Sequence, residues 1–217
     1  MDLGTEWVIG WARRCADSLS QHRTELGELD RAIGDGDHGE NMDRGFAALS
    51  AKLDDVPSDA PPSEVLRLVA TTLISTIGGA AGPLYGTAFL RASDAVTGRT
   101  ELDAGSIVAL IAAARDGIVH RGKAQPGDKT MIDAWTLALE AAIRSAAEGA
   151  EPAGLLAAAA DGAAAGAATT EPLVARKGRA SYLGERAIGH RDPGAQSTAL
   201  ILRAAADAAA ECVAGGA

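Results

Sequence analysis

The chain has 217 residues, a formal net charge of −9 and a pI of about 4.9. This acidic balance argues against nucleic-acid binders, whose affinity depends on neutralising phosphates with a basic face. Hydrophobic residues make up 47% of the chain and aromatic residues only 3%, which fits a globular domain filled by Ala, Leu, Ile and Val. The length suits one domain, over residues 1–217.

The two cysteines and the amino terminus indicate the compartment. Cys15 and Cys212 are far apart, with neither metal-ligand nor disulfide spacing, so we expect two buried thiols in a reducing environment. The opening MDLGTEW has no signal-peptide pattern, and no apolar run reaches transmembrane length. We therefore predict a cytoplasmic protein with no membrane contact.

Helical periodicity dominates the sequence, and strand signals are nearly absent. Apolar residues recur three or four positions apart, which draws one apolar stripe along each helix. The clearest stripes are Leu66, Val69, Leu73 and Ile77; Ile107, Ile111, Ala114 and Ile118; and Ile132, Trp135, Leu139 and Ile143.

The helix ends are indicated by capping residues and proline. Ser63 and Asp103 are expected to cap helices, and Asp192 is a cap followed by Pro193 at the first helical position. Segments 27–38 and 171–192 carry no helical signal, and the alanine-rich 151–169 is expected to be a helix with a small-residue face. We predict eight helices, over approximately 4–25, 39–54, 63–77, 82–97, 103–120, 130–148, 152–170 and 193–214.

Short loops make consecutive helices antiparallel, so the fold class is all-α, either a bundle or a closed ring of helices. Helices that alternate in direction place every second loop at the same end of the molecule. The four glycine-rich loops are GDGDHG, GGAAGP, GKAQPGDKT and GHRDPG. We therefore expect these four loops to meet at one mouth.

The segment LDRAIGDGDHGENMDRGF crowds Asp30, Asp35 and Asp37 together between glycines. Carboxylates this close repel one another unless a cation lies between them. Oxygen ligands without Cys or His favour Mg²⁺ or Ca²⁺, and Mg²⁺ prefers a few carboxylates together with substrate phosphates. The pattern does not fit a calcium-binding EF-hand, because Phe46 stands where a bidentate Glu belongs. A solvated acidic turn remains the alternative.

The other loops carry candidate phosphate and base contacts. His38 and Asn41 begin the helix after the carboxylates, and GGAAGPLYG is either a phosphate cradle or a tight turn. GKAQPGDKT is not a Walker A motif, because Asp128 interrupts it. It suits either a contact with an adenine ring through Gly122 and Met131 or a plain connector capped by Thr130, with Lys123 and Lys129 solvated.

The segment 171–192 is long and basic. A basic loop opposite an acidic, metal-binding one is the arrangement expected for a polyphosphate, with Arg179 as the main candidate. Tyr182 is expected to pack rather than to contact a ligand. The basic residues of the segment are Arg176, Lys177, Arg179, Arg186 and Arg191.

Four motifs together resemble the nucleotide-binding domain of the dihydroxyacetone kinase family, and in particular its standalone L-type subunits. The motifs are LDRAIGDGDHGENM, GGAAGPLYG, GKAQPGDKTM and RKGRASYLGERAIGHRDPGA, in family order over essentially the whole chain. The resemblance implies an eight-helix antiparallel up-and-down barrel with the nucleotide site at one end.

The resemblance also implies a set of site residues. Asp30, Asp35 and Asp37 would ligate two Mg²⁺ ions that hold the diphosphate of ADP or ATP, and Arg179 would supply a catalytic cation. Relatives often carry Thr or Ser where this chain has Ala80 and Ala81. The implied nucleotide contacts are His38, Gly39, Asn41, Ala80, Ala81, Gly122, Met131, Arg179, Asp192, Pro193 and Gly194.

The implied mechanism makes ADP a bound coenzyme. A phosphohistidine on a phosphocarrier M subunit donates the phosphoryl group, which then passes to dihydroxyacetone held on a separate K subunit. Phosphoryl transfer depends on positioning and charge neutralisation, which the aspartates and Arg179 offer, and this chain alone is expected to be inactive.

Other readings share the same site. One is the nucleotide-binding part of an ATP-dependent kinase of another small sugar or polyol; the sequence shows no preceding substrate domain, which disfavours the fused form. The others are a nucleotide-sensing protein that docks on a transcription regulator, and a two-metal phosphohydrolase.

Overall fold

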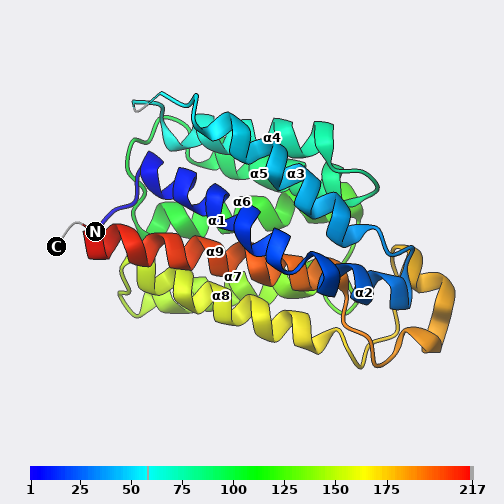
Figure 1. Ribbon diagram of the computed structural model, residues 1–217. Helices are drawn as coiled ribbons and strands as arrows, with labels where there is room; N and C mark the ends of the chain where they lie inside the picture. Colours follow the sequence, from blue (N-terminus) through cyan, green and yellow to red (C-terminus); the bar gives the residue numbers. More distant parts are fainter. Residues whose placement is uncertain (58, 216–217) are drawn as a thin grey trace.

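The computed structural model describes residues 1–57 and 59–215, which fold into nine α-helices and one 3-10 helix without a named β-strand (Figure 1). The all-α prediction is confirmed. The elements are α1 (Thr5–Gln21), α2 (Arg23–Ile33), α3 (His38–Leu53), α4 (Pro62–Thr76), α5 (Ala81–Ala95), α6 (Ala104–Gly122), α7 (Met131–Ala147), α8 (Pro152–Thr169), η1 (Arg179–Ala187) and α9 (Pro193–Gly215).

The helices pack as a closed ring. From α3 onward each helix contacts the next one along the chain, and α9 returns to contact α1, which in turn contacts α3. The short α2 lies at one end, against α3 and η1. In Figure 1 the amino terminus and the last turn of α9 lie at the opposite end of the molecule from α2 and the 171–192 segment. The ring thus has a terminal end and a loop end.

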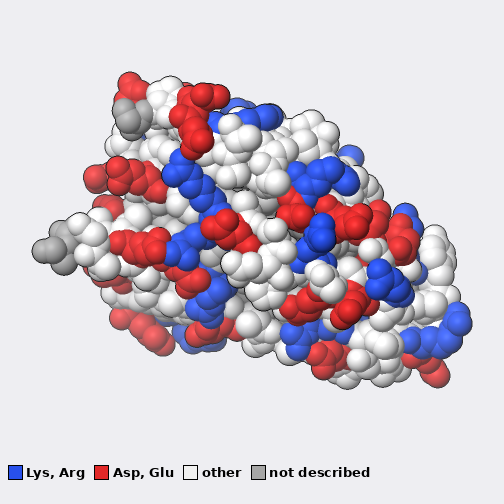
Figure 2. Space-filling model, in the orientation of Figure 1, with Lys and Arg blue, Asp and Glu red and all other residues white. Residues whose placement is uncertain are grey.

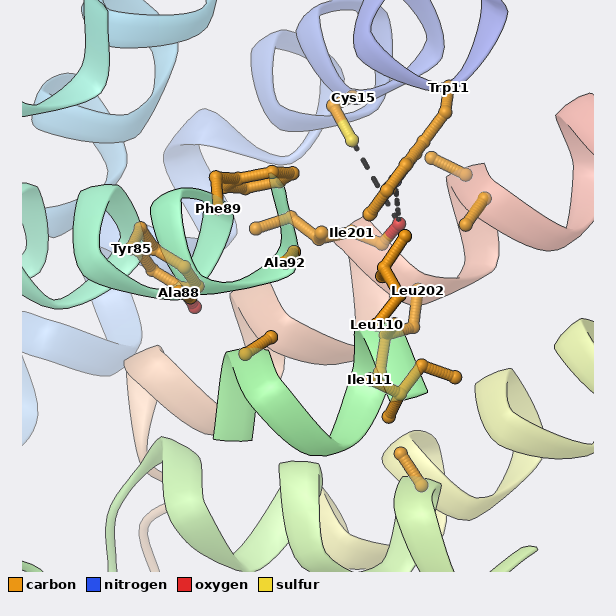
Figure 3. Packing of buried hydrophobic residues seen from close by; sticks show 14 of the residues in the cluster. Trp11, Cys15, Tyr85, Ala88, Phe89, Ala92, Leu110, Ile111, Ile201 and Leu202 are labelled. Atoms are coloured by element: carbon orange, nitrogen blue, oxygen red, sulfur yellow. Dashed lines mark hydrogen bonds between the residues drawn. The ribbon is translucent and has the colours of Figure 1, made fainter. Parts of the chain in front are cut away.

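Two tryptophans close the ring between α1 and α9. Trp7 and Trp11 stack with their ring centroids 5.3 Å apart. Their indole N–H groups donate to the carbonyls of Ala205 (3.0 Å) and Ile201 (2.8 Å) on α9. Figure 3 shows Trp11 over Ile201 with Phe89 of α5 beside it. Each indole therefore satisfies its polar atom while filling a core poor in aromatics.

Helices α7 and α8 approach closely because α8 presents glycine and alanine. A Cβ added at Gly166 would lie 2.5 Å from the carbonyl oxygen of Asp133, and one at Gly162 would lie 2.5 Å from that of Leu137. The predicted small-residue face of α8 is thus confirmed.

Segment 27–38 was predicted without helix, and this was wrong for its first half. The first predicted helix ends at Gln21, and α2 begins at Arg23 and runs to Ile33. His22 separates the two helices, because its backbone leaves the helical conformation (φ −97°, ψ 11°) while its ring Nδ1 bonds back to the carbonyl of Ser18 (2.8 Å). Burial of Leu26 and Ile33 then stabilises α2.

Segment 171–192 was also predicted without helix, but it contains η1. Gly178 and Gly184 have φ values of +64° and +57°, which lets this short helix begin and kink. Ala180 and Ala187 on η1 pack against Ile33 of α2 in a small separate cluster. The segment is therefore a folded lid over α2.

Several finer predictions can now be scored. Asp103 caps α6 through its side chain as predicted, and Thr130 caps α7, as one of the two alternatives for its loop expected. Ser63 does not cap, since α4 already begins at Pro62. Cys15 is buried as expected, but Cys212 is half-buried. The stripes are buried except for Ile143, which is 51% exposed. The buried face of α7 is centred on Trp135, Ala138 and Ala142, so Ile143 falls at its edge.

No helix among the described residues is long and apolar enough to cross a membrane. Acidic and basic side chains are interspersed over the face in Figure 2. This surface lacks the continuous basic patch that a nucleic acid would need.

The α7–α8 contact gives a stability prediction. Gly166→Ala places a methyl group against backbone atoms, 2.5 Å from Asp133 O and 2.6 Å from Ala134 Cα. The variant should lose about 1–3 kcal/mol in the free energy of unfolding, measured by urea denaturation.

Gly154→Ala on the same helix is the matched control, because its nearest contact would be 3.7 Å away at Ala150 Cβ. The control should gain up to about 1 kcal/mol from helix propensity. Equal effects of the two substitutions would contradict the close-packing argument.

Candidate functional site

A pocket of about 570 Å³ opens at the loop end of the ring. It is lined by residues of all four glycine-rich loops, which confirms that the loops meet at one mouth. This volume is within the range of small-molecule sites. The lining includes Asp35 from the first loop, Ala80 from the second, Gly122 from the third and Asp192 from the fourth.

Four helices begin at this pocket. The first residues of α3, α5, α7 and α9, which are His38, Ala81, Met131 and Pro193, all line it. Each helix N-terminus carries partial positive charge. Side chains bond some of the first N–H groups, as Thr130 does for α7 and Asp192 for α9. Four such N-termini around one cavity favour an anionic ligand such as a phosphate chain.

The three predicted metal ligands lie together at the pocket wall. Asp30 sits in the last turns of α2, whereas Asp35 and Asp37 lie between α2 and α3. Each offers a carboxylate oxygen, and these atoms lie within 4.8 Å of one another. Three oxygen donors without Cys or His fit a hard divalent cation such as Mg²⁺.

The pKa of Asp30 reflects its partial burial beside two other carboxylates. Burial raises the pKa of its carboxyl, the backbone N–H of His38 (3.1 Å) lowers it, and the charges of Asp35 and Asp37 raise it further. A bound cation would reverse this balance in favour of the charged form. The carboxylates are therefore disposed to take up positive charge.

Arg179 already supplies some of that charge. From η1, some 140 residues along the chain, its guanidinium forms an ion pair with Asp35. Lys177, Gly178 and Ala180 line the same wall of the pocket. The basic segment thus faces the acidic cluster, as the sequence predicted.

His38 is buried at the pocket floor rather than exposed as a simple cap. Burial lowers the pKa of its imidazole to about 4, which makes it neutral at pH 7. Its Nε2 bonds to the hydroxyl of Ser197 (2.9 Å), which in turn bonds to Tyr85 Oη (2.7 Å). Tyr85 also donates to the carbonyl of Gly194 (2.9 Å). This buried network fixes the His38 ring between α3, α5 and α9.

Asp192 caps α9 at the opposite wall, with its carboxylate accepting from the N–H of Ala195 (2.8 Å). Burial raises the pKa of the Asp192 carboxyl to about 7, and the nearby charge of Asp133 adds to the effect. A Cβ at Gly194 would lie 3.3 Å from Met131 Cε, so the start of α9 packs on the start of α7. Asp192 and Pro193 are thus the predicted cap and first helical residue.

All predicted site residues line the pocket except Gly39. It is buried in α3, where a Cβ would collide with the carbonyl oxygen of Arg23 on α2. Gly39 therefore permits the close approach of α2 and α3, which places Asp30 beside His38.

The sequence reasoning did not single out Arg121, which lines the pocket, whereas Lys177 was named with the basic segment and also lines it. The plain-connector alternative had Lys129 solvated, but its side chain is fully buried. Arg121 adjoins the predicted Gly122, so proximity to the loop was a usable signal. The predicted packing of Tyr182 is also wrong, since this side chain is 87% exposed.

A second hollow of about 760 Å³ lies at the terminal end. Among the described residues its side chains include Asp2, Glu6, Asp59, Glu101 and Glu211, with no Lys or Arg. Such a lining repels phosphates. The loop-end pocket is therefore the candidate nucleotide site.

Comparison with known proteins supports the same assignment. Residues 32–207 match the family described as the DAK2 domain. The chain belongs to the DAK2 domain family. The matched region includes all four pocket-lining loops and all of the carboxylate cluster but Asp30.

Full-length relatives within this family are kinase subunits, which confirms the resemblance and identifies the family as one of phosphotransferases. The chain is 42% identical over 211 residues to the ADP-binding subunit DhaL of the PEP-dependent dihydroxyacetone kinase of Escherichia coli (strain K12), covering 97% of this chain and 100% of the relative. It is 40% identical over 199 residues to the DhaL subunit of the PTS-dependent enzyme of Lactococcus lactis, covering 92% and 95%.

Solved structures of DAK2 relatives share the fold. The dihydroxyacetone kinase of C. freundii in complex with AMP-PNP and Mg²⁺ matches with a TM-score of 0.69 and 26% identity, covering 95% of this chain. The native form matches with a TM-score of 0.70. This chain spans about a third of those chains, 34% in each case.

The buried cap of α9 gives a pH-dependent prediction for the metal-free protein. Because the folded pKa of Asp192 (about 7) lies above its unfolded value of 3.8, ionisation of this carboxyl costs stability as pH rises through 7. Asn still caps a helix. Asp192→Asn should therefore raise Tm at pH 8 by about 2–5 °C, with less effect at pH 5.

Asp103→Asn is the control with the opposite sign. Bonds from the Ser106 side chain and backbone lower the pKa of the exposed Asp103, so its stabilisation is present at neutral pH and lost as pH falls through that pKa. This control should lower Tm at pH 8. A scanning calorimetry series in which both substitutions lowered Tm equally at pH 8 would contradict the burial argument.

Proposed function

We propose that this chain is the nucleotide-binding subunit of a dihydroxyacetone kinase. It would hold ADP as a coenzyme, accept a phosphoryl group from a phosphohistidine on a carrier subunit, and pass it to dihydroxyacetone on a separate K subunit. The observation that carries the proposal is the pocket in which a three-carboxylate cluster faces Arg179 beneath four helix N-termini.

The relatives support this proposal because the match covers nearly the full length of both proteins. The chain covers full-length DhaL subunits, which are named as ADP-binding subunits of a PEP-dependent kinase. A related kinase has been solved with AMP-PNP and Mg²⁺. ADP or ATP with Mg²⁺, in a two-ion arrangement, is accordingly the ligand we assign to the pocket.

The residues of this chain would divide the work of binding. Asp30, Asp35 and Asp37 would hold Mg²⁺, which when bound neutralises the diphosphate and the charge that develops during phosphoryl transfer. The backbone N–H groups at Ala80 and Ala81 would receive phosphate oxygens without help from a hydroxyl side chain.

Further residues would orient the nucleotide. The base would lie against Gly122, Met131 and the start of α9 at Asp192, Pro193 and Gly194. His38 and Asn41 would contact the nucleotide from α3, with the neutral His38 ring held by Ser197. Arg179 would place its guanidinium beside the transferred phosphoryl group and stabilise the negative charge there.

A second candidate function differs in the acceptor. The chain is 37% identical over 191 residues to L-erythrulose 1-kinase of Mycolicibacterium smegmatis, covering 88% of this chain but only 32% of that relative. A relative named as a kinase of another small ketose makes an acceptor of that class the second candidate. Activity assays with each acceptor on the purified K partner would distinguish the two.

The metal-ligand assignment is tested by Asp37→Ala. Loss of one of the three carboxylates should abolish retention of ADP while leaving far-UV circular dichroism unchanged. Native mass spectrometry should show a mass increment of ADP plus two Mg²⁺ on the wild-type protein and none on the variant.

Glu28→Ala is the control for loss of an acidic group, because Glu28 is exposed on α2 and does not line the pocket. It should retain the full increment. ADP kept by Asp37→Ala would refute the ligand assignment, and loss in both variants would point to net charge.

The role of Arg179 is tested by Arg179→Met. Removal of a cation that acts on the transferred group should reduce the phosphoryl-transfer rate about 10²–10³-fold, while the Kd for Mg-ADP changes far less. The rate is measured with the carrier and K subunits of the same system.

Arg186→Met serves as the matched control, because Arg186 lies on the same short helix but outside the pocket lining. Its rate should match that of the wild type. A loss of rate fully explained by weaker ADP binding would contradict the assignment of Arg179 to catalysis.

A further inference from the structure

Lys129 is a buried lysine that none of the motif reasoning uses. It lies in the loop between α6 and α7 with 0% of its side chain exposed. Its ammonium donates to the carbonyl oxygens of Thr170 (2.6 Å), His190 (2.5 Å) and Glu171 (3.3 Å). Three N–H donors thus meet three acceptors from distant parts of the chain.

These carbonyls lie at the two ends of the segment 171–192, which we call the lid segment: Glu171 and His190 belong to it, and Thr170 immediately precedes it. Its ends lie side by side: the N–H of Gly189 donates to Glu171 O (2.8 Å), and that of Asp192 donates to Thr170 Oγ1 (3.0 Å). Arg191 also pairs with the Glu171 carboxylate (2.7 Å). We call residues 170–171 and 189–192 the neck.

Beyond the neck the lid segment has few anchors. Its apolar contact with α2 is a small cluster in which Ala175, Ala180 and Ala187 pack with Ile33, with the partly buried Leu183 against it. Its other links are the ion pair of Arg179 with Asp35 and one backbone bond, from the N–H of Arg176 to the carbonyl of Asp128 (3.1 Å). A cluster made mostly of alanines buries little area, so the position of the lid segment depends largely on the neck.

We propose that Lys129 is a positioning residue whose buried ammonium closes the neck of the lid segment and thereby fixes Arg179 and Asp192 against the base-binding loop. The proposal deepens the proposed function and rests on it. Lys129 belongs to the loop that carries Gly122 and Met131, so one cation joins the base wall to the phosphate wall.

The charge of Lys129 suits this role. The carbonyls of Thr170 and Glu171 follow the C-terminus of α8, where free carbonyls and the helix dipole favour a cation. Burial lowers the pKa of the ammonium, and the charges of Asp192, Glu171 and Asp133 oppose that shift. An apolar side chain of the same length would leave the buried Thr170 and its neighbours short of donors.

The alternative is that Lys129 merely stabilises the fold as a whole. The two roles predict different regions of faster amide hydrogen exchange when Lys129 is replaced. A general staple would reduce protection throughout, whereas a neck clamp would loosen the lid segment and leave α4, on another side of the ring, unchanged.

The test compares Lys129→Met, Lys129→Arg and Lys123→Met. Lys123 is the matched control: it occupies the same loop, has a positive φ of 54° against 61° for Lys129, and is exposed. The measurements are amide hydrogen exchange of the nucleotide-free protein and the Kd for Mg-ADP by calorimetry.

In Lys129→Met, exchange over 171–192 should rise and Kd should weaken, each about 10- to 100-fold, the factor for losing a charged hydrogen bond. Exchange over Pro62–Thr76 should not change. Lys129→Arg, which keeps the cation and its donors, should fall between Lys129→Met and the wild type, and Lys123→Met should match the wild type.

Wild-type exchange over 171–192, or a uniform rise over every helix, would overturn the proposal. If Lys129→Met does not fold, Thr170→Val provides the test, because it removes the hydroxyl that accepts from Asp192 N–H and leaves the Thr170 carbonyl in place. Unchanged exchange over 171–192 and an unchanged Kd in this variant would overturn the proposal that the neck positions the lid segment. Failure of the wild-type protein to bind Mg-ADP would instead refute the proposed function, and the exchange result would still test the clamp.

Discussion

Like charges repel, and the loop end of this ring places carboxylate oxygens of Asp30, Asp35 and Asp37 within 4.8 Å of one another. The surrounding structure is arranged to supply positive charge to them. Arg179 comes from η1, and the N-termini of four helices, with their partial positive charge, line the same cavity. A divalent cation with a polyphosphate completes such a site, since each component neutralises another.

The ring makes this convergence possible with an unusual core. With few aromatic residues, close approach of backbones replaces bulk: Gly166 lets α8 reach α7, and Gly39 lets α3 reach α2. The two stacked tryptophans supply volume where α1 meets α9. Small residues thus bring the helix ends close enough for their loops to share one pocket, so the packing of the helices and the shape of the site have the same cause.

The sequence predicted the features whose chemistry is local. The carboxylate cluster and the caps at Asp103 and Asp192 depend on residue type and short spacing. The four loops met as predicted because short connections force alternating directions. Residue type, short spacing and loop length can therefore be interpreted directly from one sequence.

The errors arose where tertiary contacts decide. Lys129 looks solvated in the sequence, since only the fold brings Thr170 and His190 to its ammonium. The helical first half of 27–38 depends on burial of Leu26 and Ile33. Tyr182 was expected to pack, but its neighbours in the lid segment leave it exposed. A long-range partner cannot be read from spacing within one segment.

The loop that carries Ala80 and Ala81 offers backbone groups and no hydroxyl side chain at the pocket. Ala80 is the residue before α5 and provides no side-chain cap, and Gly79 reaches a φ of +64° to turn the chain into the helix. The N–H groups of the first turn of α5 therefore remain free for an anion. Because these donors belong to the backbone, the phosphate contact that we propose for this loop would depend on its conformation rather than on its side chains. Gly79, whose positive φ sets the turn, is accordingly more constrained in conformation than the two alanines that follow it.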